Sequence, residues 1–146
     1  MHDLTGHTAL VTGASRGLGF AAARALALRG ARLVIASRGG ERLADAQRAL
    51  ADEGIAAAAI AADLRHLEEI ERLVEEAQMR LGQIDILVAN NGGPPPRAAA
   101  ELTEEEWQAA VPAVLLFVPR LVRLVLPAMR AAGWGRIVAI NSISSR

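Results

Sequence analysis

The amino-acid sequence predicts an α/β fold, a single domain of residues 1–146 in which helices cover both faces of a doubly wound parallel sheet. Three observations support this prediction. Short runs of β-branched and apolar residues alternate with longer segments of helical spacing, hydrophobic residues make up 52% of the chain, and a glycine-rich turn follows the first apolar run. Such a composition can bury a sizeable core, and short, wholly apolar runs are typical of strands buried on both faces of a parallel sheet.

Five apolar runs are short enough to be strands, and four segments between them have the spacing of helices. The expected strands are residues 8–12, 32–36, 57–61, 86–89 and 136–140. The first three expected helices, each with a glycine shortly after its end, are residues 18–29, 41–52 and 67–81. Glycine suits the C-terminal cap of a helix because it adopts left-handed backbone conformations without strain. Strands that alternate with helices imply right-handed crossover connections between parallel strands.

The fourth helix begins at a capping box, in which Thr103 and Glu106 form the pattern T-x-x-E. Pro112 and Pro119 fall inside this expected helix, where each removes an N–H donor, and we expect them to bend it. The preceding stretch GGPPPRAAA, residues 92–100, is expected to be an irregular surface loop.

Composition and charge exclude several classes of function. The formal net charge is zero, so no basic surface is expected to recruit nucleic acid or an anionic membrane. There is no cysteine, and His2, His7 and His66 lack the spacing of metal ligands, so no metal site is predicted. We find no signal sequence and no apolar run near 18 residues, which favours a soluble, cytoplasmic protein. The sequence also contains no tyrosine, and all 16 of its basic residues are arginine, so it contains no lysine either.

The segment ALVTGASRGLG, residues 9–19, is the clearest functional motif. An expected strand runs into Gly13, and Gly17 and Gly19 follow where a helix begins. Glycines at such a junction permit a tight turn, close approach to a pyrophosphate and close packing of helix on strand, and the helix N-terminus attracts phosphate. The alternative is a turn that serves packing alone. The motif favours a Rossmann-type sheet of order 3-2-1-4-5, which binds a dinucleotide between its first and fourth strands.

The motif TGASRGLG matches the T-G-x-x-x-G-x-G pattern of the classical short-chain dehydrogenase/reductase family, and the resemblance extends along the whole chain. ILVANNGG, residues 86–93, resembles a variant of the family's N-N-A-G element. LPAMRAAGWGRIVAINS, residues 126–142, resembles the end of the family's fourth helix, its fifth strand and its catalytic serine. NNGGPPP is similar to a subgroup called 3-oxoacyl-carrier-protein reductase-like. The resemblance implies an oxidoreductase that transfers hydride between a nicotinamide and a small carbonyl or alcohol substrate. The sequence does not identify the substrate.

The resemblance implies a role for particular residues. Ser142 is the implied catalytic residue, which polarises the substrate carbonyl; it could instead be a simple strand-end serine. Asp63 resembles the aspartate that binds adenine, although it could cap the helix beginning near His66. Asn90 belongs to the N-N-A-G element, although asparagine is also common in turns. The implied cofactor-binding residues are Gly13, Ser15, Arg16, Gly17, Leu18, Gly19, Ser37, Arg38, Asp63, Leu64, Asn90 and Gly92.

The end of the second strand indicates which nicotinamide cofactor is preferred. An NAD-selective site usually has an acidic residue there, but IASRGG, residues 35–40, contains none, and the next carboxylate is Glu41. Arg38 can offer a planar, permanently charged fork to a 2′-phosphate. Arg16 lies where NADP-preferring members of the family often have a second basic residue. Together they favour NADP(H), with NAD(H) as the alternative.

Two departures from the family pattern limit these expectations. The family's Y-x-x-x-K acid/base motif would follow Ser142 by about a dozen residues, and this chain ends at Arg146. We therefore expect the N-terminal, cofactor-binding portion of a reductase; the alternative is a non-catalytic dinucleotide-binding module or an inactive remnant. Val114 occupies the position of the family's relay asparagine.

The fourth helix also bears on the expected partners. Its apolar series is expected either to face the core or to form a homo-oligomer interface, and comprises Val114, Leu115, Val118, Leu121, Val122 and Val125. A complementary C-terminal fragment is the other expected partner, since an uncovered fifth strand would favour aggregation or self-association.

Overall fold

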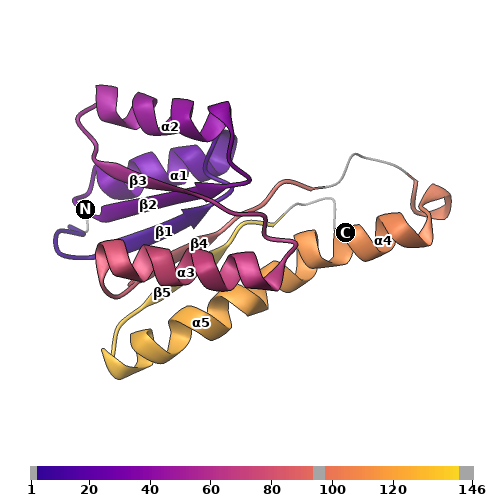
Figure 1. The fold of residues 1–146 in the computed structure, drawn as a ribbon. Coiled ribbons are helices and arrows are strands. Elements are labelled where there is room, and N and C mark those ends of the chain that lie inside the picture. The colour runs from indigo at the N-terminus through magenta and orange to yellow at the C-terminus, as the bar shows by residue number, and fades with distance from the viewer. Residues whose placement is uncertain (1–2, 94–97, 142–146) are drawn as a thin grey trace.

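The computed structural model describes residues 3–93 and 98–141 and contains one five-stranded parallel sheet (Figure 1). Its strands are β1 (Thr8–Thr12), β2 (Arg32–Ser37), β3 (Ala57–Ala61), β4 (Ile86–Ala89) and β5 (Arg136–Ala139). They lie in the order β3-β2-β1-β4-β5, and every neighbouring pair is parallel. The predicted fold class and strand order are therefore confirmed. Each expected strand is present, with boundaries that differ by at most one residue.

Helices cover both faces of the sheet, as a doubly wound fold requires (Figure 1). The helices are α1 (Gly17–Ala27), α2 (Glu41–Asp52), α3 (Leu67–Leu81), α4 (Glu104–Val111) and α5 (Phe117–Ala131). Helices α1 and α2 pack on one face, while α3 and α5 pack on the other. The bounds of α2 and α3 are those the sequence predicted. Helix α1 ends two residues earlier than expected, because Arg29 and Gly30 donate to carbonyls only three residues back and tighten the last turn.

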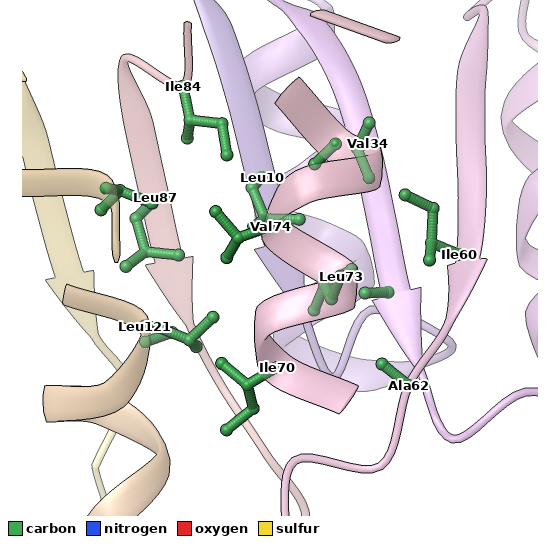
Figure 2. Close-up of a cluster of buried hydrophobic side chains, with 14 of the residues drawn as sticks. Leu10, Val34, Ile60, Ala62, Ile70, Leu73, Val74, Ile84, Leu87 and Leu121 are labelled. Carbon is green, nitrogen blue, oxygen red and sulfur yellow. The ribbon is translucent and has the colours of Figure 1, made fainter. Parts of the chain in front are cut away.

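The buried core consists of two layers separated by the sheet, and alternate strand residues supply each layer. Leu10 of β1 faces α3 and α5, whereas Ala9 and Val11 face α1 and α2, and all three are fully buried. Figure 2 shows the first layer, in which Leu73 of α3 and Leu121 of α5 pack toward the strands. Central strands buried on both sides in this way account for the runs of β-branched and apolar residues in the sequence.

The fourth helix of the sequence prediction is interrupted by a π-helical turn, η2 (Pro112–Leu116), which joins α4 to α5. Pro112 has no N–H to donate to the preceding turn, and the N–H of Phe117 reaches back five residues to the Pro112 carbonyl. The effect of Pro112 is thus a local widening of the helix, and Pro119 lies in the first turn of α5. The predicted capping box is present at Thr103 and Glu106.

The apolar series on this helix divides between core and surface. Leu121 and Val125 are fully buried against the sheet, while Val114 and Leu115 are 51% and 63% exposed. Neither of the two predicted roles therefore covers the whole series. The helical stretch Glu104–Ala131 is also long and apolar enough to span a membrane by length and composition, which corrects the expectation that no such run exists. Helix α5, which forms the second part of this stretch, packs on β4 and α3 in the buried core.

The predicted loop of residues 92–100 contains a short 3-10 helix, η1 (Ala99–Glu101), at its end. Residues 94–97 of that loop lie outside the described part of the chain. At the far side of the sheet, β5 is an edge strand whose four residues are all exposed, as the sequence predicted for the fifth strand.

Candidate functional site

The junction between β1 and α1 is a tight turn that lies against the end of β4. Gly13 and Gly17 have left-handed φ angles of 58° and 59°, which other residues rarely adopt. A Cβ atom on Gly13 would lie 2.7 Å from both the side-chain nitrogen and the carbonyl oxygen of Asn90, and a Cβ on Gly19 would collide with the Gly13 carbonyl. The glycines at these positions therefore keep strand, turn and helix closer together than any side chain would allow.

Asn90 ties the ends of β1 and β4 together. Its side-chain amide donates to the Gly13 carbonyl at 3.1 Å, and its backbone N–H donates to the Thr12 hydroxyl at 3.0 Å. The same hydroxyl donates to the Asn90 carbonyl at 2.7 Å. No described residue other than glycine has a positive φ angle, so Asn90 is not a left-handed turn residue. Asn90 thus lies beside Gly13, at the end of β4.

Thr12 was not among the predicted site residues, although it is the first letter of the TGASRGLG motif. Its side chain is fully buried at the end of β1 and uses both hydrogen-bonding functions of its hydroxyl on Asn90. A threonine at the end of a strand expected to be buried was the available signal, because a buried hydroxyl requires a partner.

The N-terminus of α1 is open to solvent beside this turn. Arg16 occupies the cap position in extended conformation, no side-chain hydrogen bond caps the helix, and its first turn contains no acidic residue. Arg16, Gly17 and Leu18 are exposed, and Ser15 is half-buried. The free N–H groups and the positive end of the helix dipole favour an anion here.

The end of β2 places a second arginine at the same edge of the sheet. Ser37 is the last residue of β2, and Arg38 follows it with an exposed side chain. Within the described residues, neither Arg38 nor Arg16 forms an ion pair. Both guanidinium groups are thus available to a ligand anion.

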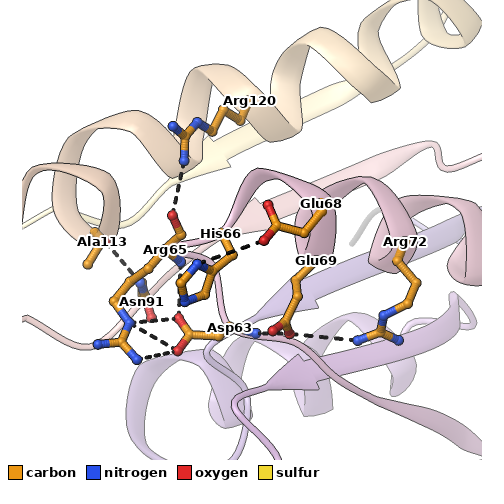
Figure 3. A network of polar contacts seen from close by, with 9 residues as sticks. All are labelled: Asp63, Arg65, His66, Glu68, Glu69, Arg72, Asn91, Ala113 and Arg120. Carbon is orange, nitrogen blue, oxygen red and sulfur yellow. Dashed lines mark hydrogen bonds and ion pairs between the residues drawn. The ribbon is translucent and has the colours of Figure 1, made fainter. Parts of the chain in front are cut away.

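Asp63 follows β3 and forms a fork with Arg65 (Figure 3). The Nε of Arg65 lies 3.0 Å from each carboxylate oxygen, and the Arg65 backbone N–H donates to Oδ1 at 3.0 Å. The hydrogen bond from the Arg65 side chain is the main cause that holds the pKa of Asp63 below its ordinary value, and the same contact raises the pKa of Arg65. A ligand at Asp63 would share this carboxylate with Arg65.

The structure also tests whether Asp63 caps the helix that follows it. Its carboxylate makes an Asx turn with Arg65 and no bond to the first-turn N–H groups of α3, whose cap residue His66 lacks a side-chain hydrogen bond. The alternative in which Asp63 caps α3 is therefore excluded, and the implied role of Asp63 in cofactor binding stays a prediction. The neighbouring Leu64 is 3% exposed and belongs to the core, so only its backbone is available to a ligand.

Asn91 connects the end of β4 to the π-helical turn η2. Its side-chain nitrogen donates to the Ala113 carbonyl at 2.8 Å, and its side-chain oxygen accepts from the Gly92 N–H at 2.9 Å. Arg120 of α5 donates to the Arg65 carbonyl at 3.2 Å (Figure 3). The Asn91–Ala113 and Arg120–Arg65 contacts, which the sequence did not reveal, join η2 and α5 to the edge of the sheet where Asn90 and Asp63 lie.

The predicted catalytic residue, Ser142, lies outside the described residues. The strand that leads toward it is described: Ala139 of β5 pairs with Ala89 of β4, and the N–H of Ile140 donates to the Ala89 carbonyl at 3.0 Å. The end of β5 is therefore adjacent to the end of β4, where Asn90 follows. In the described part of the chain, no group of three or more histidine, aspartate or glutamate side chains could hold a metal ion.

Comparison with known proteins identifies the group to which this arrangement belongs. The family model described as short chain dehydrogenase matches residues 7–146. A ketoacyl reductase of Nostoc sp. is 41% identical and covers 100% of this chain and 51% of its own length. A D-beta-hydroxybutyrate dehydrogenase of Cupriavidus necator is 37% identical, with coverage of 95% and 54%.

A solved structure extends the likeness to three dimensions. The 3-oxoacyl (acyl-carrier-protein) reductase of Agrobacterium tumefaciens C58, crystallised with NADP bound, is 33% identical and has a TM-score of 0.89. The match covers 97% of this chain and 54% of that protein. The chain thus spans about half the length of the relatives that it matches.

Proposed function

Because the chain belongs to the short-chain dehydrogenase family, we propose that it binds NADP(H) and provides the cofactor-binding part of an oxidoreductase. The proposed reaction is hydride transfer between the nicotinamide and a carbonyl or alcohol substrate. One observation above all supports the binding step. The glycine turn of residues 13–19 lies against Asn90 at the carboxyl edge of a parallel sheet, where α1 presents an uncapped N-terminus.

The residues at this edge fit a dinucleotide that carries an additional phosphate. The N–H groups of α1 suit the pyrophosphate, and the lack of a Cβ on Gly13 and Gly19 keeps the turn compact. Arg16 and Arg38, which have no ion-pair partner among the described residues, suit a 2′-phosphate. The NADP bound to the Agrobacterium reductase, which shares this fold, supports the same assignment.

The chemistry divides between the cofactor and this chain. Bound NADP(H) would supply or accept the hydride. Ser142 would hold the substrate oxygen through a hydrogen bond from its hydroxyl. Asn90 would keep the ends of β1 and β4 in register beneath the site through its contacts with Thr12 and Gly13.

A second candidate function is cofactor binding without turnover. The sequence contains neither a phenol nor an amine side chain, so the 146 residues provide no tyrosine or lysine for proton transfer. Both candidates share the binding step and differ only in whether a carbonyl is reduced.

Isothermal titration of the purified chain with NADPH and with NADH tests the shared step. We expect 1:1 binding of NADPH and weaker binding of NADH. Equal affinity for the two cofactors would contradict the NADP(H) preference, and failure to bind either would contradict the proposed function itself. Intact mass of the sample establishes that the chain tested has these 146 residues.

A further inference from the structure

A groove opens at the amino ends of β2 and β3, at the opposite end of the strands from the proposed cofactor site. Its volume is about 640 Å³, which is within the usual range for small-molecule pockets. Residues of four elements line it: the start of β2, helix α2, the start of β3 and the end of α3. None of the predicted cofactor-binding residues belongs to this lining.

Three arginines and no acidic residue line the groove: Arg32 of β2, Arg48 of α2 and Arg80 of α3. Two of these charges are already compensated, since Arg48 pairs with Asp45 and Arg80 lies 3.6 Å from Glu76. Arg32 forms no ion pair with any residue in the described ranges. The lining therefore offers one uncompensated positive charge beside two further guanidinium groups.

Arg32 is held in place at the groove. Its Nη2 donates to the Arg80 carbonyl at 3.0 Å, in the last turn of α3, and its backbone N–H donates to the His7 carbonyl at 2.9 Å. A guanidinium has five N–H donors, so most of them remain available to a ligand. Because the group is already fixed, binding an anion costs less side-chain entropy than it would at a free surface arginine.

The floor of the groove is apolar. Leu33, Ile55 and Leu81 lie there with at most 9% of their surface exposed, and short alanine side chains of β3 leave the space above them open. The side-chain nitrogen of Gln47 donates to the Ala57 carbonyl at 2.8 Å, which occupies one backbone acceptor of this edge strand. The groove thus combines the fixed guanidinium group of Arg32 at one end with an apolar floor.

We propose that this groove binds an amphipathic carboxylate, with its head group on Arg32 and its apolar body over Leu33, Ile55 and Leu81. One uncompensated charge matches a monoanion, and guanidinium binds carboxylate through paired hydrogen bonds. The apolar lining distinguishes such a ligand from a small inorganic anion. Contact with its exposed and half-buried alanines, Ala51, Ala56, Ala57 and Ala58, removes apolar surface from water. Because the groove and the cofactor edge lie at opposite ends of the strands, the two ligands bind independently.

Calorimetric titration with octanoate, without NADPH, tests this proposal, and amide chemical shifts locate the ligand. We expect 1:1 binding with shift changes at Leu33, Ile55 and Leu81. Arg32→Gln should weaken binding at least tenfold, on the order of loss of a charge-assisted contact. The matched control Arg29→Gln removes an exposed arginine that does not line the groove and should leave affinity unchanged.

Octanol and acetate are the matched probes, and both should bind much more weakly than octanoate. Equal affinity for octanol, or shift changes confined to the exposed apolar residues of η2, would overturn the proposal by showing apolar adsorption alone. Equal affinity for acetate would overturn it by showing that the floor plays no part. Arg48→Gln replaces a second arginine of the lining, at an exposed helix position, and should weaken binding to a smaller extent. It keeps the proposal testable if the Arg32 variant fails to fold. NADPH binding is measured separately, so either proposal can fail while the other stands.

Discussion

At the scale of single residues, the proposed cofactor edge carries two arginines that pair with no carboxylate in the part of the chain that the structure describes. Arg16 lies within the glycine turn and Arg38 follows β2, and both are exposed. Guanidinium is always charged and binds phosphate through a fork of N–H donors. An acidic residue at the end of β2 would repel a 2′-phosphate and would instead accept a ribose hydroxyl. The residues present favour the phosphorylated cofactor.

Replacing Arg38 with alanine should therefore change cofactor selectivity. We expect NADPH affinity to fall by about 1–3 kcal/mol, through loss of a charge-assisted contact, and NADH affinity to remain nearly unchanged. Calorimetric titration of both cofactors measures the two effects. Arg29→Ala, an exposed arginine beyond the far end of α1, is the control. A parallel loss of NADH affinity would show that Arg38 does not recognise the 2′-phosphate.

The fork between Asp63 and Arg65 should make stability depend on pH. The hydrogen bond from Arg65 lowers the pKa of Asp63 in the folded state, so its contribution is complete above the ordinary pKa, about 3.9, and is lost as pH falls through the lower folded value. Asp63→Asn should reduce the free energy of unfolding at about pH 7 by up to about 1 kcal/mol, because Arg65 is half-exposed, and should have a smaller effect at about pH 3.

Urea unfolding at both pH values measures this difference. Asp45→Asn, which removes an exposed pair with Arg48, is the control and should change stability by less than about 0.5 kcal/mol at about pH 7. A penalty for Asp63→Asn that persists unchanged in acid would mean that the ion pair is not its cause.

At the scale of elements, the continuous helical segment α4–η2–α5 has an exposed apolar surface and a buried one, and the helical pitch changes between them. The π-helical turn begins at Pro112, and the side chain of Asn91 holds the Ala113 carbonyl within it. Beyond the turn, α5 directs Leu121 into the core, whereas Leu115 within the turn is 63% exposed. A change of pitch alters which residues share a face, so one apolar series serves both core and surface.

Matched leucine replacements test this division. Leu121→Ala should lower the free energy of unfolding by about 2–5 kcal/mol, since it empties a fully buried site between α5, α3 and β4. Leu115→Ala should lower it by no more than about 0.5 kcal/mol. Urea unfolding of both variants supplies the measurement. Similar penalties for the two would show that Leu115 is also buried in solution, as in a homo-oligomer formed through this helix.

At the scale of the whole molecule, the fold was predictable because local patterns and global topology agree. Short runs of β-branched and apolar residues predicted the strands, and the glycine turn predicted the tight junction between β1 and α1. The π-helical turn was not predictable, because Pro112 can either bend or widen a helix and only packing decides between them. The fork of Asp63 with Arg65 was also missed. The same sequence allows a carboxylate after a strand to cap a helix, to form an Asx turn or to bind a ligand.

The last prediction concerns what the 146 residues do by themselves. They contain the glycine turn and Asn90 but no tyrosine or lysine, so NADPH binding should occur without appreciable carbonyl reduction. General acid–base assistance typically contributes about 10²–10⁴-fold to a rate, and a serine hydroxyl alone donates only a hydrogen bond to the substrate. Following NADPH absorbance with a 3-oxoacyl thioester tests this expectation on a sample of confirmed intact mass. NADPH-dependent turnover by a monodisperse 15.4 kDa species would require a different proton donor within this chain.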